Sequence, residues 1–151
     1  CTYPNNDAGG KIIIDRLNAI PRCNYAFFYL EPSLGRRRYH GILALSLQGF
    51  KVICVGNTSS GIKETAAFEC PSVNIGSRQN GRLHADNVIH VPYDKQKIID
   101  AIQFCCNENK FTRSLSKIKN PYGIGGSGRK FRKIIENIAL NKKILQKKIT
   151  I

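Results

Sequence analysis

The sequence predicts an α/β domain built on a mostly parallel sheet flanked by helices. Short apolar runs alternate along the chain with amphipathic segments of helical period, as expected of strand–helix–strand units. Two of these runs, 50–55 and 72–75, have the character of strands buried on both faces. A polar turn from Gly56 to Gly61 follows the first run, at the place where open α/β sheets bind ligands.

In the first half of the chain, helices are predicted where apolar residues recur every three or four positions. Strands are predicted where aromatic or β-branched residues run together. Pro21 and Gly49 mark the ends of the two helices. The elements expected here are a helix from about Asp7 to Ile20, a strand at 24–30, a helix at 36–47 and a strand at 50–55.

The same patterns divide the second half of the chain, where lysines interspersed with apolar residues predict a basic last helix. The elements expected here are a helix at 60–69, strands at 72–75 and 87–91, a helix at 94–106, a loop at 107–122, a flexible turn at 123–128 and a helix at 129–148. We divide the chain into a sheet domain, 1–128, and a lysine-rich helix, 129–151. About four strands are visible, whereas such sheets average roughly five or six, so we expect the domain to be incomplete at its N-terminus.

The composition indicates a globular chain with anionic partners. The 151 residues are 42% hydrophobic, which is enough for one domain with its own core. The formal net charge of +14 favours nucleotides, nucleic acid or acidic surfaces as partners. No apolar run approaches the roughly 20 residues that cross a bilayer, so no membrane partner is expected.

The cysteines and histidines predict a reduced, cytoplasmic chain without a metal or other cofactor. No C-x-x-C pair is present, and the three histidines are scattered. Disulfides are the alternative interpretation of an even cysteine count. The six cysteines are Cys1, Cys23, Cys54, Cys70, Cys105 and Cys106.

The turn after the first buried strand has two interpretations. As a ligand site, its backbone N–H groups at a helix start attract an anion, and Thr58, Ser59 and Ser60 add hydroxyl donors. Gly61 would then let a phosphate approach the backbone closely. As a structural feature, the turn is a serine-rich helix cap in which Glu64 is the capping-box partner of Ser60 or Gly61. The residues alone favour neither interpretation.

Three charged residues accompany this turn. Glu64 lies one turn into the helix, where a carboxylate can accept hydrogen bonds from the vicinal hydroxyls of a sugar. Arg78 and Arg82 follow the next strand at a four-residue spacing, and arginine suits bidentate binding of phosphate. Each of the three also has an ordinary interpretation as a cap or a surface charge.

A second glycine-rich segment, 123–128, matches G-x-G-x-x-G but predicts a flexible turn. The segment before it is not a buried strand, and no acidic residue follows at the right distance in a strand–helix–strand unit. Acidic residues and histidines elsewhere are dispersed and form no recognisable catalytic set. The residues therefore predict a chain that holds a phosphorylated ligand, without an obvious means of transforming it.

These motifs resemble a known family. Residues 56–68, G-N-T-S-S-G-I-K-E-T-A-A-F, and 70–89, C-P-S-V-N-I-G-S-R-Q-N-G-R-L-H-A-D-N-V-I, are similar to the carboxy-terminal half of UDP-N-acetylglucosamine 2-epimerases. The similarity is closer to the hydrolysing type, which feeds sialic and related nonulosonic acid synthesis. T-Y-P-N-N-D-A-G-G at 2–10 and N-P-Y-G-I-G-G-S-G at 120–128 fall in the family's order.

The resemblance implies the second, nucleotide-binding domain of a GT-B fold, in which two Rossmann-like domains face each other across a cleft. Residues 58–61 would cradle the diphosphate of UDP, Glu64 would bind the ribose hydroxyls, and Arg78 would lie near the nucleotide. Asn5 and Lys11 align with residues of an allosteric nucleotide-sugar site in the animal bifunctional members.

The resemblance also implies a reaction. Loss of the anomeric UDP and of the C2 proton gives a 2-acetamidoglucal. Hydration of this glycal yields N-acetylmannosamine and UDP, whereas re-addition of UDP gives UDP-N-acetylmannosamine. The acids and bases belong largely to the family's first domain, so we expect this chain to be inactive without an N-terminal half.

Several alternatives stay open at this point. The chain could be a catalytically inactive UDP-sugar-binding fragment, or part of a non-hydrolysing epimerase. Homo-oligomerisation is also left open. A basic nucleic-acid-binding module is the remote alternative, because the charge favours it but no recognised motif accompanies it.

Overall fold

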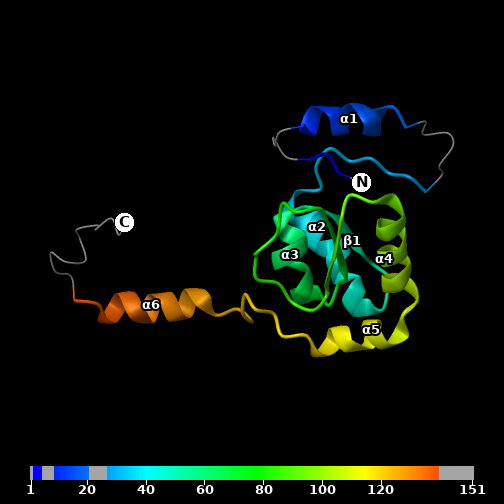
Figure 1. The fold of residues 1–151 in the computed structure, drawn as a ribbon. Helices are drawn as coiled ribbons and strands as arrows, with labels where there is room; N and C mark the ends of the chain where they lie inside the picture. Colours follow the sequence, from blue (N-terminus) through cyan, green and yellow to red (C-terminus); the bar gives the residue numbers. More distant parts are fainter. Residues whose placement is uncertain (1, 5–8, 21–26, 140–151) are drawn as a thin grey trace.

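The computed structural model describes residues 2–4, 9–20 and 27–139. At its centre is a parallel sheet in the order β1 (Cys54–Gly56), β2 (Ser72–Ile75) and β3 (Val88–Val91). A short helix, α3 (Ser59–Lys63), and a 3₁₀ helix, η3 (Thr65–Phe68), connect β1 to β2. Helices on both faces of the sheet confirm the predicted Rossmann-like α/β class (Figure 1).

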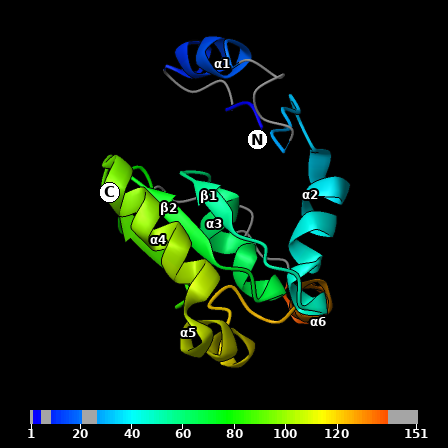
Figure 2. The ribbon, with the colours of Figure 1, turned by 90° about the vertical axis from the view of Figure 1, so that its right-hand side faces the viewer.

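The two faces of the sheet are covered differently. Helix α4 (Lys95–Asn107), which Asp94 caps through the Lys97 N–H, packs on one face with a core that includes Val73 and Val91 (Figure 2). Helix α3 approaches the other face very closely, because a side-chain carbon at Gly61 would lie only 3.0 Å from Oγ of Ser72. Thus α3 carries the predicted ligand residues from the end of β1 across the sheet.

The segment before β1 largely follows the prediction. Helix α2 (Gly35–Ala44) and a 3₁₀ helix, η2 (Ser46–Gln48), replace the predicted helix 36–47, and Gly49 ends them in the left-handed conformation. The predicted strand 50–55 was too long at its start. Pairing begins only at Cys54, whose partner Ser72 is the first residue of β2.

The predicted strand 24–30 is wrong for its described residues. Residues 27–30 form no strand; the nearest pairing is an isolated parallel bridge between Thr2 and Glu31, and residues 24–26 lie outside the described part. Strand propensity needs a neighbouring ladder to become a strand. The described residues therefore form a three-stranded sheet in place of about four strands. Helix α1 (Gly10–Asn18) begins after Asp7, which is itself outside the described residues.

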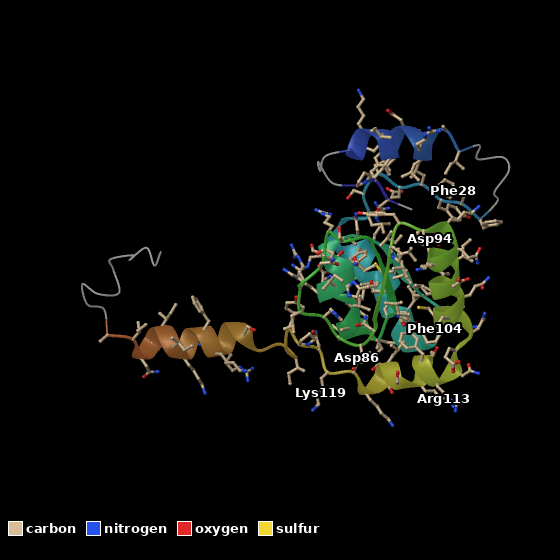
Figure 3. The ribbon with its side chains drawn as sticks, viewed as in Figure 1. Phe28, Asp86, Asp94, Phe104, Arg113 and Lys119 are labelled. Atoms are coloured by element: carbon tan, nitrogen blue, oxygen red, sulfur yellow. The ribbon has the colours of Figure 1, made fainter. Side chains whose placement is uncertain are left out.

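The segment predicted as a loop at 107–122 contains helical structure. Helix α5 (Asn109–Ser114) is capped by Glu108 and continues into a 3₁₀ helix, η4 (Leu115–Lys117). Phe111 stacks against Phe104 with 5.1 Å between ring centroids, and Leu115 is buried. Arg113 and Lys119 extend outward from this region (Figure 3).

The last described helix, α6 (Ser127–Asn137), projects away from the sheet (Figure 1). It begins two residues before the predicted start at 129 and ends at Asn137, where Ile138 turns extended; residues 140–148 of the predicted helix lie outside the described part. All of its residues are exposed. None of the described helices, α6 included, has the length and apolar character needed to cross a membrane.

Candidate functional site

The turn after β1 forms a built helix start. Thr58 is the cap: its Oγ1 accepts from the Ser60 N–H at 3.3 Å and lies 2.9 Å from the Ser60 hydroxyl. Ser59 is exposed beside them. Because the first N–H groups of a helix lack intrahelical acceptors, this turn presents donors and a partial positive charge at the carboxyl end of β1.

Gly61 has a packing role that the sequence did not predict. It is buried, and its missing side chain faces Ser72 and Cys54 of the sheet, with the Cys54 Sγ 3.4 Å from the position of a side-chain carbon. The expectation that a phosphate approaches the backbone at Gly61 stays a prediction. Its small size lets α3 lie on the sheet, which holds Thr58 and Ser60 in place.

The loop after β2 is tied to the turn after β1. Nε2 of the buried Gln79 donates to the Asn57 carbonyl at 2.7 Å, and Nη1 of Arg78 donates to the same oxygen at 3.5 Å. The structure thus brings the Arg78 guanidinium to the edge where α3 begins. The sequence placed both loops at one sheet edge, but gave no signal for the Gln79 link that joins them.

Glu64 does not complete a capping box. Its Oε2 lies 2.6 Å from Nε2 of His40, which comes from α2. The side chains of Thr58 and Glu64 therefore have different partners: Thr58 accepts from the Ser60 N–H, and Glu64 pairs with His40. The capping-box interpretation of Glu64 is wrong, and His40 is a site residue that sequence reasoning missed.

A cleft of about 380 Å³ lies between α2 and the α3–η3 segment. Tyr39, next to His40, anchors α2 here, with its hydroxyl 3.8 Å from the Cys54 Sγ. Burial, together with the nearby Cys54, raises the pKa of Tyr39, so its hydroxyl stays protonated. The cleft is lined by Arg36, His40, Lys63, Glu64, Ala67 and Phe68.

Arg82 lies in another place from Arg78. It lines a second cleft of about 480 Å³ with His84 and His90, whose rings meet edge to face at 4.7 Å. Nδ1 of His90 accepts from Nδ2 of the buried Asn74 at 3.0 Å. Desolvation, and then the charge of His84, lower the pKa of His90. The structure therefore separates the two arginines that the sequence spacing paired.

The described cysteines are free thiols. These are Cys54, Cys70, Cys105 and Cys106, and Cys1 and Cys23 lie outside the described residues. Burial raises the pKa of Cys70 to about 12 and that of Cys105 to about 11, so neither is a reactive thiolate near neutral pH. Among the described residues, no three His, Cys, Asp or Glu side chains cluster as metal ligands do.

Of the two residues predicted for an allosteric site, Lys11 is described and does not lie in this region. Lys11 lies exposed on α1, which sits apart from the sheet and α3 (Figure 1). Asn5 lies outside the described residues. The allosteric role of this pair stays a prediction.

Two buried polar residues, Asn87 and Thr65, support the site and were not predicted. Nδ2 of Asn87 donates to Oγ1 of Thr65 at 2.9 Å and to the Cys70 carbonyl at 2.7 Å. Thr65 in turn donates to the Gly61 carbonyl at 2.8 Å. This chain of bonds connects the loop before β3 to the helix that carries Glu64, and isolated polar residues give no periodic signal from which to predict it.

The sequence of this chain is similar to known proteins of one family. Residues 1–136 match a family described as UDP-N-acetylglucosamine 2-epimerase. The chain is 37% identical over 109 residues to the UDP-N-acetylglucosamine 2-epimerase of Neisseria meningitidis, covering 72% of this chain and 27% of that protein. It is 32% identical over 147 residues to the hydrolysing UDP-N,N'-diacetylbacillosamine 2-epimerase of Legionella pneumophila, covering 97% and 36%.

A third relative is the Escherichia coli polysialic acid biosynthesis protein P7, 32% identical over 118 residues, with 78% of this chain and 28% of that protein covered. The chain thus spans between about a quarter and about a third of the length of these curated relatives. The matched segment includes both loops that meet at Asn57 and the helix that carries Glu64.

Proposed function

The chain belongs to the UDP-N-acetylglucosamine 2-epimerase family, and from this we propose that it forms the UDP-binding part of a hydrolysing 2-epimerase. The substrate would be a UDP-linked N-acetylated amino sugar. One observation carries the proposal: Gln79 and Arg78 both donate to the Asn57 carbonyl, just before α3, the helix that Glu64 follows directly. Diphosphate donors and a carboxylate for a ribose thereby lie on neighbouring elements.

We assign different parts of the nucleotide to different residues of the site. We assign the diphosphate to the hydroxyls and N–H groups of residues 58–61 and to Arg78, and the ribose hydroxyls to Glu64. Departure of UDP leaves negative charge on the diphosphate, and donors that are already oriented stabilise this charge as it forms. These residues therefore bind the leaving group and promote its loss. In this assignment the chain corresponds to the second domain of a GT-B fold.

The hydrolysing outcome is proposed on the names of relatives. The Legionella relative carries that description, and so does a GDP/UDP-N,N'-diacetylbacillosamine 2-epimerase of Campylobacter jejuni that is 38% identical over 88 residues. We assign the acids and bases that move the C2 proton to an N-terminal half outside this chain, as the resemblance implies.

Calorimetry and a product assay test the two parts of this proposal. We expect the chain to bind UDP, to bind single-stranded DNA no better than a matched polyanion, and to release no N-acetylmannosamine by itself. Adding the N-terminal half of the Legionella relative should restore turnover. Absence of UDP binding contradicts the binding assignment, and turnover by the chain alone contradicts the assignment of the proton chemistry. Binding without turnover in the combined sample would favour an inactive UDP-sugar-binding chain.

A further inference from the structure

We propose that His40 is a positioning residue that directs the Glu64 carboxylate toward the ribose of a bound uridine nucleotide. This inference rests on the proposed function. It adds a residue from α2 to a site otherwise made by the two loops at the sheet edge. It also predicts a specificity, since a correctly directed carboxylate recognises the ribose 2′-hydroxyl.

The contact between His40 and Glu64 is close and specific. Nε2 of His40 lies 2.6 Å from Oε2 of Glu64, and both side chains are partly exposed, at 30% and 42%. Because a carboxylate only accepts hydrogen bonds, the imidazole is the donor. None of the described residues donates a hydrogen bond to Oε1 of Glu64, so this oxygen and the second lone pair of Oε2 remain for the hydroxyls of a ligand.

The imidazole ring is itself held in position. Its centroid lies 5.3 Å from that of Phe68 in η3 and 5.9 Å from that of Tyr39. Tyr39 contacts Cys54 of β1, which fixes α2 against the sheet. A donor that already contacts two aromatic rings can orient its acceptor at a small cost in conformational entropy.

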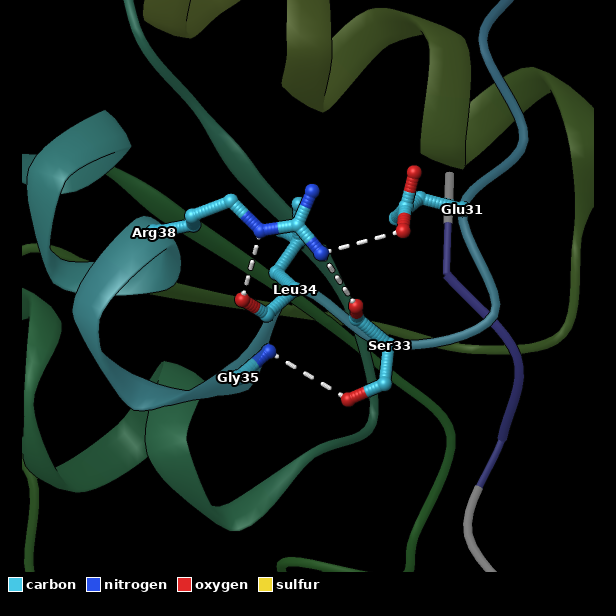
Figure 4. A network of polar contacts seen from close by, with 5 residues as sticks. All are labelled: Glu31, Ser33, Leu34, Gly35 and Arg38. Atoms are coloured by element: carbon cyan, nitrogen blue, oxygen red, sulfur yellow. Dashed lines mark hydrogen bonds and ion pairs between the residues drawn. The ribbon is translucent and has the colours of Figure 1, made fainter.

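The start of α2 is clamped two residues before His40 (Figure 4). The Arg38 guanidinium donates to Oε1 of Glu31 at 3.0 Å, and also to the Ser33 carbonyl at 2.9 Å and the Leu34 carbonyl at 3.0 Å. These bonds close the turn into α2 over the segment from Glu31. The helix therefore presents His40 from a defined position.

The lysine and the arginine that also line this cleft do not take the place of His40. Lys63 lines the same cleft, but its Nζ lies over the ring of Tyr122, 5.8 Å from the centroid. Arg36 also lines the cleft and is exposed. His40 is thus the donor in direct contact with the carboxylate. Without His40, the Glu64 side chain would become ordered only when the ligand binds.

Titration of the full chain with UDP and with 2′-deoxy-UDP tests the inference. His40→Leu should weaken UDP binding about 3- to 10-fold, the cost of ordering one side chain on binding, and should change 2′-deoxy-UDP binding less than about 2-fold. His40→Gln, whose amide replaces the Nε2–H donor, should keep most of the UDP affinity. His84→Gln, in the other cleft, is the matched control and should leave both affinities unchanged.

Three results would overturn the inference while the proposed function stands: unchanged UDP binding in His40→Leu, equal weakening of both nucleotides, or no rescue by His40→Gln. The melting temperature of each variant shows whether it is folded. A folding defect would lower the affinities for UDP and 2′-deoxy-UDP together, whereas the inference predicts a loss of selectivity between them. Failure of the unmodified chain to bind UDP would overturn the proposed function, and this inference with it.

Discussion

Two glycine-containing turns lead into helices in this chain, residues 56–61 before α3 and residues 123–128 before α6. The first follows a buried parallel strand, is capped by Thr58 and is tied to the next loop by Gln79. The second precedes a helix whose cap, Gly126, is in the left-handed conformation at φ 78° and has no side-chain cap bond. Only the second matches G-x-G-x-x-G in full.

The difference shows that neighbouring elements decide what a glycine-rich turn can bind. A strand, a packed helix and a second loop surround the first turn with fixed donors, whereas α6 is exposed along its length. Each helix even carries a glutamate paired with a cationic or imidazole side chain, Glu64 with His40 and Glu136 with Arg132. The second region therefore supplies matched controls for the first.

The largest expected effect is on Glu64. Glu64→Gln should weaken UDP binding by about 1.5–3 kcal/mol, because the ribose hydroxyls lose a charged acceptor. Glu136→Gln removes an exposed pair four residues apart in α6 and should leave UDP binding unchanged. Calorimetry measures the UDP affinity of both variants. Equal affinities would contradict the binding role of Glu64 and leave it with a structural role.

Gly61 should be the next most sensitive position. Gly61→Val places atoms against Ser72 and Cys54 and should lower the free energy of unfolding by about 1–3 kcal/mol. Gly128→Val lies in α6 with open space around it and should change stability by less than about 0.5 kcal/mol. Urea unfolding compares the two, and a tolerated valine at Gly61 would disprove the close packing of α3.

Loss of the Thr58 cap should have a smaller effect. Thr58→Ala should cost about 1 kcal/mol of stability, because the Ser60 N–H loses its acceptor. Ser127→Ala, at the start of α6, makes no such loss and should be nearly neutral. Chemical unfolding of both variants decides whether the first turn is capped in solution.

The smallest expected effect is a dependence of stability on pH that comes from His90, in the cleft lined by Arg82 and His84. The folded-state pKa of His90 is lowered by desolvation and by His84, so the folded chain binds fewer protons than the unfolded chain. Its contribution to stability is present above the unfolded-state pKa of roughly 6.5 and is lost as the pH falls toward the lowered value. His90→Gln should flatten the change in melting temperature between pH 7.5 and 5.5, and an unaltered slope would exclude His90 as its source.

Local sequence patterns were sufficient to predict the elements in which those patterns are strong. Strand β2 has the predicted bounds, and α4 (Lys95–Asn107) lies within one residue of the predicted helix at 94–106. The aromatic segment before Glu31 failed as a strand because pairing depends on a neighbour, which no local pattern specifies. Helix α5 was missed because its polar residues obscure the burial of Leu115, which arises from tertiary packing.

The candidate site was predictable in part for the same reason. Loop positions at strand ends follow from the α/β order, so residues 58–61 and Arg78 could be expected at one edge. The partners of Glu64 and Asn57 could not, since His40 and Gln79 belong to other elements and are single residues without a spacing rule. The packing role of Gly61 could not be predicted either, because it depends on Ser72 and Cys54 of the sheet.

Backbone amide NMR spectra recorded during a UDP titration test the central claim most directly. We predict chemical-shift changes concentrated at residues 56–64 and 77–79, with residues 123–128 and α6 unaffected. Changes confined to residues 123–128, or saturable binding that leaves residues 56–64 unperturbed, would contradict the assignment of the UDP site to the turn that follows β1.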